Sequence, residues 1–166
     1  MRQRGPLLGL TVTTVLSGVS VSNGLGWSPD DGTMYYVDSL ERAIDAFDFD
    51  AQSGQLTNRR RLVAIEAETG MPDGMAVDSA GFVWVALWGG GAVHRYDPAG
   101  ELDLVVRLPA TQVSSSSFGG ADLRDLYVTS ASRGLSADDR RRQPDAGAVF
   151  RVRVDVPGVP AARFGG

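Results

Sequence analysis

The sequence predicts an all-β fold. Short runs of β-branched and aromatic residues alternate with clusters of Gly, Pro, Asp and Ser, and no stretch shows a sustained helical period. The chain also carries 21 glycines, which fit a protein with many tight turns between short strands. The expected strands are 10–16, 23–28, 33–38, 43–49, 60–65, 74–78, 82–87, 92–97, 102–107, 113–118, 124–129 and 147–154.

These expected strands repeat along the chain. The segments that begin at Tyr36, Trp84 and Tyr127 align with one another, and each follows a turn. A repeat of about 40–50 residues with four strands is typical of a β-propeller blade. We therefore expect part of a propeller, with three blades and part of a fourth. The three expected blades span about 18–66, 68–108 and 110–155, with a polar surface loop inserted at 131–147.

Composition excludes several classes of function and site. The chain has 166 residues, enough for one domain, and a net charge of −4, which argues against a nucleic-acid partner. It has no cysteine and one histidine, so a metal site must use mainly oxygen ligands. No apolar run is long enough to span a membrane. Residues 10–16 favour a strand over a signal peptide, and we expect a cytoplasmic protein.

Two stretches place an oxygen ligand beside a glycine at the start of an expected strand. Asn23 lies in the segment SNGLGW, and Asp73 lies in the segment MPDGM. The inner strands of propeller blades run beside one central channel, so residues at equivalent strand starts point at a common axis. Amide and carboxylate oxygens suit a divalent cation such as Ca²⁺, Mg²⁺, Mn²⁺ or Zn²⁺. Taken singly, each residue also fits an ordinary turn.

Other reactive residues fit simpler roles. The serine run 114–117 lacks a G-x-S-x-G motif, so a serine hydrolase is not expected, although Ser116 or Ser117 is a candidate for a substrate contact in the channel. His94 is expected to be a blade-surface residue rather than a metal ligand. Asp78 precedes the turn Ser-Ala-Gly and is expected to cap it.

Several longer motifs together resemble the senescence marker protein/gluconolactonase/luciferin-regenerating enzyme family, from about residue 10 to the end of the chain. Residues 1–9 match no motif of that family and are expected to be a separate leader, which leaves 10–166 as the partial propeller. The matching stretches are 15–30, 34–39, 72–75, 95–98, 117–120, 126–131 and 147–150.

The resemblance implies a six-bladed propeller with one divalent cation on its axis and hydrolysis of lactones or small sugar-acid esters. In that family a Glu near the N-terminus, the Asn of the SNGL-type motif and the Asp of the PDG-type motif hold the metal. Asn23 and Asp73 match the last two, and Asp73 is also the implied acid/base. We expect this chain to supply the C-terminal half of such a propeller, while the Glu and further substrate-binding residues belong to earlier blades.

Two functions are therefore expected from different classes. The first is a metal-dependent lactone hydrolase that acts on a small lactone or sugar acid, with neither nucleic acid nor membrane expected as a partner. The second is a catalytically inactive propeller remnant that binds calcium or another metal. A further alternative is self-association, in which two copies pair through exposed blade faces. A monomeric mass by light scattering at micromolar concentration would contradict that pairing.

Overall fold

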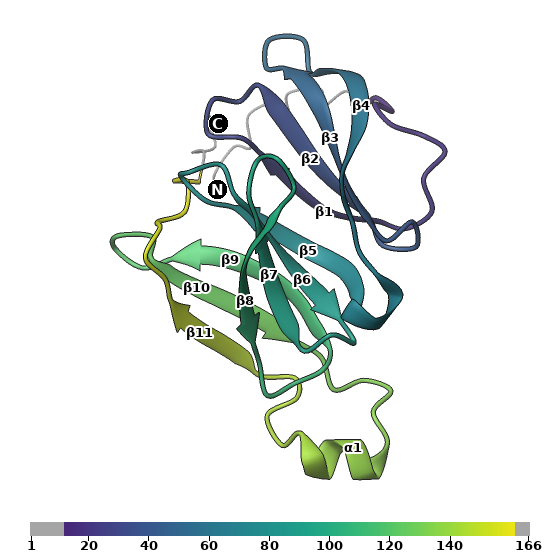
Figure 1. Cartoon of the computed structure of the whole chain (residues 1–166), viewed down its shortest axis with the longest axis vertical. Coiled ribbons are helices and arrows are strands. Elements are labelled where there is room, and N and C mark those ends of the chain that lie inside the picture. Colours follow the sequence, from purple (N-terminus) through teal and green to yellow (C-terminus); the bar gives the residue numbers. More distant parts are fainter. Residues whose placement is uncertain (1–11, 162–166) are drawn as a thin grey trace, which may run out of the picture.

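The chain folds into three antiparallel β-sheets that pack against one another (Figure 1). The computed structural model describes residues 12–161. Within each sheet, consecutive strands of the chain are hydrogen-bonded neighbours, so every sheet is a meander whose register is set by its turns. The predicted all-β class is confirmed, with one short α-helix inserted late in the chain.

The strands have the following bounds. Sheet one contains β1 (Ser22–Trp27), β2 (Thr33–Asp38), β3 (Ala43–Asp50) and β4 (Gln55–Ala64). Sheet two contains β5 (Met71–Val77), β6 (Val83–Trp88), β7 (Ala92–Tyr96) and β8 (Leu102–Arg107), and the short 3-10 helix η1 (Ala67–Thr69) precedes it. Sheet three contains β9 (Val113–Gly119), β10 (Asp125–Ser130) and β11 (Val149–Arg153), with α1 (Ala137–Arg142) between its last two strands.

Sheet two lies in the middle and is buried on both faces. Alternate residues of a strand point to opposite faces, so β6 sends Val83, Val85 and Leu87 toward sheet one, and Trp84 and Ala86 toward sheet three. The core shared with sheet one is completed by Tyr35, Val37, Ile44, Ala46, Val63, Ile65, Met75, Val77 and Tyr96. The core shared with sheet three is completed by Val93, Val113, Leu126, Val128 and Val154.

The first strands of the three sheets lie side by side, with β1 against β5 and β5 against β9. Two glycines make this close approach feasible. A Cβ atom on Gly24 would lie 2.8 Å from the backbone oxygen of Asp73, and one on Gly74 would lie 2.8 Å from the Cα of Ser115. Because real Cβ atoms essentially never come that close, a larger residue at either position would push the strands apart.

The repeat read from the sequence is offset by one residue in sheet one. Leu25 pairs with Tyr36 just after a bulge in β1, and Met75 pairs with Val85 just after a bulge in β5. The counterpart of Trp84 is therefore Tyr35, whereas Tyr36 faces the opposite side of its sheet. A one-residue shift exchanges the two faces of a strand, and the sequence alone offered an aromatic residue at both positions.

The strand expected at 10–16 is wrong for its described part. Residues 12–16 form no strand, and residues 10 and 11 lie outside the described residues. Leu16 and Val19 instead cover the outer face of sheet one, where they pack against Met34, Tyr36 and Phe47. The Asp38 carboxylate accepts hydrogen bonds from the Ser20 and Val21 amides at 2.7 and 3.0 Å. These side-chain contacts, rather than the regular backbone pairing of a strand, fix the end of this segment.

The stretch 131–147, expected as a loop, contains the helix α1. Ser136 caps this helix, because its hydroxyl accepts a hydrogen bond from the Asp139 amide at 3.0 Å. Asp138 pairs with Arg141, and Asp139 pairs with Arg142, each three residues apart on the same turn. None of the helical residues is buried, so the mixed charge run is a solvated surface element.

Candidate functional site

Asn23 and Asp73 both lie at β-bulges. In β1 the pairing with β2 jumps from Ser22–Asp38 to Leu25–Tyr36, which leaves one extra residue in β1. In β5 the pairing with β6 jumps from Pro72–Leu87 to Met75–Val85 in the same way. A bulge turns a side chain out of the regular alternation and is a common device next to functional sites. The Asn-Gly and Asp-Gly pairs of the two motifs form these bulges.

The two side chains line one open pocket of about 230 Å³ between sheets one and two. The other lining residues are Val21, Ser39, Leu40, Met71, Pro72 and Trp88. Asn23 donates a hydrogen bond from Nδ2 to the Ser39 hydroxyl at 3.1 Å, which fixes the orientation of the amide. Within residues 12–161, no hydrogen bond engages the Asn23 Oδ1 atom, which leaves it available as a ligand oxygen.

Burial raises the pKa of the Asp73 carboxyl, because the pocket wall removes water from around the charged form. Polar contacts with the Asn23 side chain and the Gly74 backbone amide oppose that shift without cancelling it. Asp73 therefore lies half-buried in the wall of an open pocket, a position from which a carboxyl can exchange a proton with a bound molecule.

The pair fits part of a hard-cation site. One amide oxygen and one carboxylate oxygen are of the right kind for calcium or magnesium, which take about six or more oxygens in total. Among residues 12–161, no group of three or more His, Cys, Asp or Glu side chains converges as a metal site would require. The described part of the pocket therefore offers two candidate oxygen ligands, Asn23 and Asp73.

Sequence reasoning did not assign two residues of this pocket. The sequence favours Trp88 as a packing residue over one at a channel mouth, but Trp88 pairs with Met71 beside the Asp73 bulge and lines the pocket. Ser39 directly follows β2 and binds the Asn23 amide. Only the pairing of strands could have indicated both residues. Ser39 lies just after the end of β2, which pairs with the bulged β1, and Trp88 lies at the end of β6, which pairs with the bulged β5.

The predicted surface position of His94 is wrong. Its side chain is buried in β7, and Nδ1 lies 3.0 Å from the Tyr96 hydroxyl. Burial and the nearby Arg107 charge lower the pKa of His94, and burial raises that of Tyr96 to about 12. His94 does not line the pocket of Asn23 and Asp73. Ser116 is also buried, opposite Val128 in the core between sheets two and three, whereas Ser117 is exposed.

Asp78 caps its turn, as expected, but it also holds a larger buried network. It accepts hydrogen bonds from the Ala80 and Phe82 amides at 2.9 and 3.1 Å, and from Trp84 Nε1 at 2.9 Å. Arg95 pairs with the same carboxylate at 2.7 Å, and its guanidinium lies 3.7 Å from the centre of the Phe82 ring. Both oxygens of the Asp78 carboxylate are therefore occupied by contacts that stabilise the fold.

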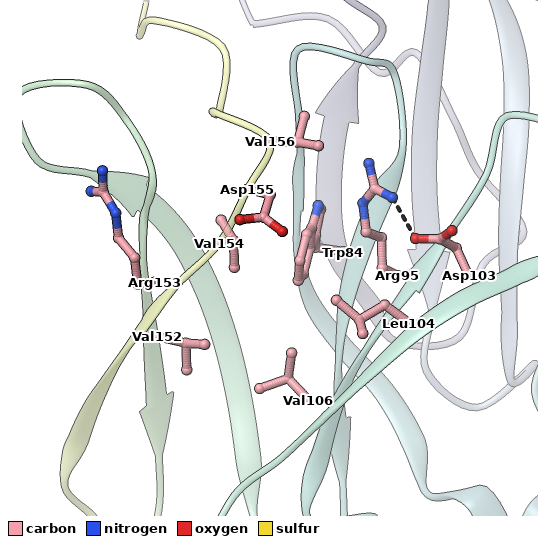
Figure 2. Close-up of a pocket in the computed structure, with 10 residues that line it drawn as sticks. All are labelled: Trp84, Arg95, Asp103, Leu104, Val106, Val152, Arg153, Val154, Asp155 and Val156. Carbon is pink, nitrogen blue, oxygen red and sulfur yellow. Dashed lines mark hydrogen bonds and ion pairs between the residues drawn. The ribbon is translucent and has the colours of Figure 1, made fainter.

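A second open groove, of about 450 Å³, lies between the outer strands of sheets two and three. Figure 2 shows Trp84, Arg95 and Asp103 on one side of it and the segment around Val154 on the other. The Arg95 charge is already neutralised by Asp78 and Asp103. None of the predicted site residues lines this groove, so the pocket of Asn23 and Asp73 is the better candidate.

Comparison with known proteins identifies the family. Residues 7–132 match the model of the SMP-30/Gluconolactonase/LRE-like region. The chain belongs to this family. It is 45% identical over 150 residues to regucalcin from Oryctolagus cuniculus and to regucalcin from Gallus gallus, an alignment that covers 89% of the chain and 50% of each relative. The chain thus spans about half the length of the curated relatives that it matches.

Solved structures of the family have the same fold. A regucalcin from Agrobacterium tumefaciens, described as a calcium-binding protein, superposes with a TM-score of 0.86 at 32% identity, over 93% of this chain and 53% of that one. A luciferin-regenerating enzyme gives 0.78 at 36% identity, over 86% and 48%. A gluconolactonase from Xanthomonas campestris gives 0.63 at 26% identity, over 86% and 40%. Across residues 12–161, no helix is long and apolar enough to cross a membrane.

Proposed function

We propose that the chain carries half of a lactone-hydrolase site of the gluconolactonase type, with Asn23 and Asp73 as ligands of one divalent cation. The observation that carries this proposal is the convergence of two bulged inner strands on one pocket, each with an oxygen ligand at the bulge. Membership of a family that includes a gluconolactonase and a calcium-binding regucalcin supports it.

In this proposal, Asn23 and Asp73 have different chemical roles. A bound divalent cation, whether Ca²⁺, Zn²⁺, Mn²⁺ or Mg²⁺, would polarise the lactone carbonyl and lower the pKa of a bound water. Asn23 offers a neutral oxygen whose direction is fixed by Ser39. Asp73 offers a charged oxygen that faces the pocket, and its carboxylate can take a proton from the attacking water and return it to the leaving alkoxide.

The proposed architecture is half of a six-bladed propeller. In it the three sheets are blades that span about 18–66, 68–108 and 110–155, and β1, β5 and β9 lie next to the central channel. The relatives are about twice as long as this chain, so the remaining ligands of the site would come from a part of the propeller beyond these three sheets.

A catalytically inactive metal-binding protein is the second candidate. The observation that favours it is the small ligand set, since the described residues bring one carboxylate into the pocket and no cluster of three. Such a protein would keep the metal affinity of Asn23 and Asp73 while lacking the residues that complete the hydrolytic site.

Lactone hydrolysis measured by pH-stat separates the two candidates. The hydrolase predicts turnover of glucono-lactone with added metal, and at least about a hundredfold loss in Asp73→Asn, which keeps the shape of the side chain but cannot accept the proton. Asp145→Asn, at an exposed position in the third sheet's insertion, is the matched control and should retain full activity. Absence of turnover in the wild type at saturating metal would favour the inactive metal-binding protein.

A further inference from the structure

The inner strand of sheet three carries the same irregularity as those of the other two sheets. In β9 the pairing with β10 runs from Ser115–Thr129 directly to Val113–Ser130, so Ser114 is the extra residue. All three inner strands are therefore bulged near their first residues, although only the first two carry a residue that family motifs single out. A bulge re-aims its side chain, so a third occurrence at the same level needs its own explanation.

Close contacts between the strands fix which residues correspond. Gly24 lies against the backbone between Asp73 and Met75, which is the position of Gly74. Gly74 in turn lies against the Cα, Cβ and Oγ atoms of Ser115. Gly24, Gly74 and Ser115 are thus neighbours in one row. The residues that precede them, Asn23, Asp73 and Ser114, form the adjacent row at the three bulges.

The chemistry of Ser114 differs from that of the first two members of this row. Its hydroxyl lies 2.9 Å from the Thr129 hydroxyl, and Thr129 can also donate to the Ser115 carbonyl at 3.4 Å. Both hydroxyls remain open to solvent. When Thr129 donates to the backbone, it accepts the Ser114 proton, and the Ser114 oxygen then keeps lone pairs for a donor from a ligand. A neutral hydroxyl pair is a weak cation site but a good partner for alcohol groups.

We propose that Ser114, oriented by Thr129, binds a hydroxyl group of a polyhydroxylated lactone or of the corresponding sugar acid. The inference rests on the proposed function, because it takes the row of Asn23, Asp73 and Ser114 as one wall of the same site. Ser114 lies outside the small pocket of Asn23 and Asp73 but on the strand directly next to β5. A six-carbon ligand held at Asp73 can reach across this contact, since the two strands touch at Gly74 and Ser115.

Calorimetric titration of gluconate in the presence of Ca²⁺ tests this role. Ser114→Ala should weaken gluconate binding by about tenfold, the usual effect of losing one hydrogen bond to a ligand, and should leave Ca²⁺ affinity unchanged. Ser114→Thr, which keeps the hydroxyl, should retain binding and shows that a loss in the alanine variant is not a folding defect. Ser117→Ala is the matched control, since Ser117 is exposed on the same strand and lies outside the bulge.

The outcomes separate this inference from the function on which it rests. Equal gluconate affinity in the wild type and in Ser114→Ala overturns the inference, as does a wild type that binds no gluconate with Ca²⁺ present. Equal losses in Ser114→Ala and Ser117→Ala overturn it as well. A wild type that binds gluconate and hydrolyses no lactone contradicts the proposed function alone, and a selective loss in Ser114→Ala still supports the inference in that case.

Discussion

Asp73 and Asp78 lie at opposite ends of β5, and their surroundings differ in almost every respect. Asp78 is fully buried, and its two oxygens accept hydrogen bonds from two backbone amides, an indole and a guanidinium. Asp73 is half-buried, faces an open pocket and has no cationic partner among the described residues. A carboxylate whose oxygens are all paired stabilises the fold, whereas a partly desolvated carboxylate without a cationic partner fits the ligand role that we propose for Asp73.

Removal of Asp78 should produce the largest change in stability. Asp78→Ala would leave the Trp84 indole N–H without a partner and the buried Arg95 guanidinium with only the half-exposed Asp103, which costs about 3–5 kcal/mol in the free energy of unfolding. Urea denaturation measures this loss. Asp103→Ala is the control, because Asp103 binds the same arginine at a half-exposed position and should cost under about 1 kcal/mol. Equal losses of unfolding free energy in Asp78→Ala and Asp103→Ala would contradict the structural role that we assign to Asp78.

Replacement of Asp73 should have a smaller effect on stability and in the opposite direction, a slight gain. Because its pKa is raised above 3.8 in the folded state, folding favours the protonated form, and this advantage is lost as the pH rises through the raised pKa. Asn is neutral at every pH. In metal-free buffer, Asp73→Asn should therefore be slightly more stable than the wild type at pH 7, by under about 1 kcal/mol, and the difference should vanish below about pH 3.8. A wild type that is the more stable protein at pH 7 would contradict this assignment.

The two outer sheet faces show how far local patterns predict structure. The apolar outer face of sheet one is covered by Leu16 and Val19, and Leu16 belongs to the stretch 10–16, which the sequence predicts as a strand because its residues favour strands. On sheet three, Tyr127 and Val149 remain exposed. β-propensity describes a fit to a half-buried sheet surface, so it does not show whether a segment joins a sheet or covers one. Self-association through such an exposed face stays a prediction.

In the candidate site too, features set by local sequence could be predicted, whereas features set by pairing between distant strands could not. The positions of Asn23 and Asp73 near equivalent strand starts could be predicted because each lies in a local turn-like motif, and their role as metal ligands stays a prediction. The roles of Trp88, Ser39 and Ser114 depend on which residue pairs with which across strands, and a single extra residue in a bulge changes that pairing. The partnership of Asp78 with Arg95 joins two strands across sheet two and leaves no local signature.

Calorimetric titration with Ca²⁺ tests the central claim most directly. The wild type should bind one Ca²⁺ per chain, and Asp73→Ala and Asn23→Ala should each weaken that binding by at least about tenfold, because each removes one of two protein ligands. Asp145→Ala, at an exposed carboxylate, should bind as the wild type does. Equal affinity in the wild type and in Asp73→Ala, or no binding by the wild type, would contradict the assignment of Asn23 and Asp73 as the metal centre of this chain.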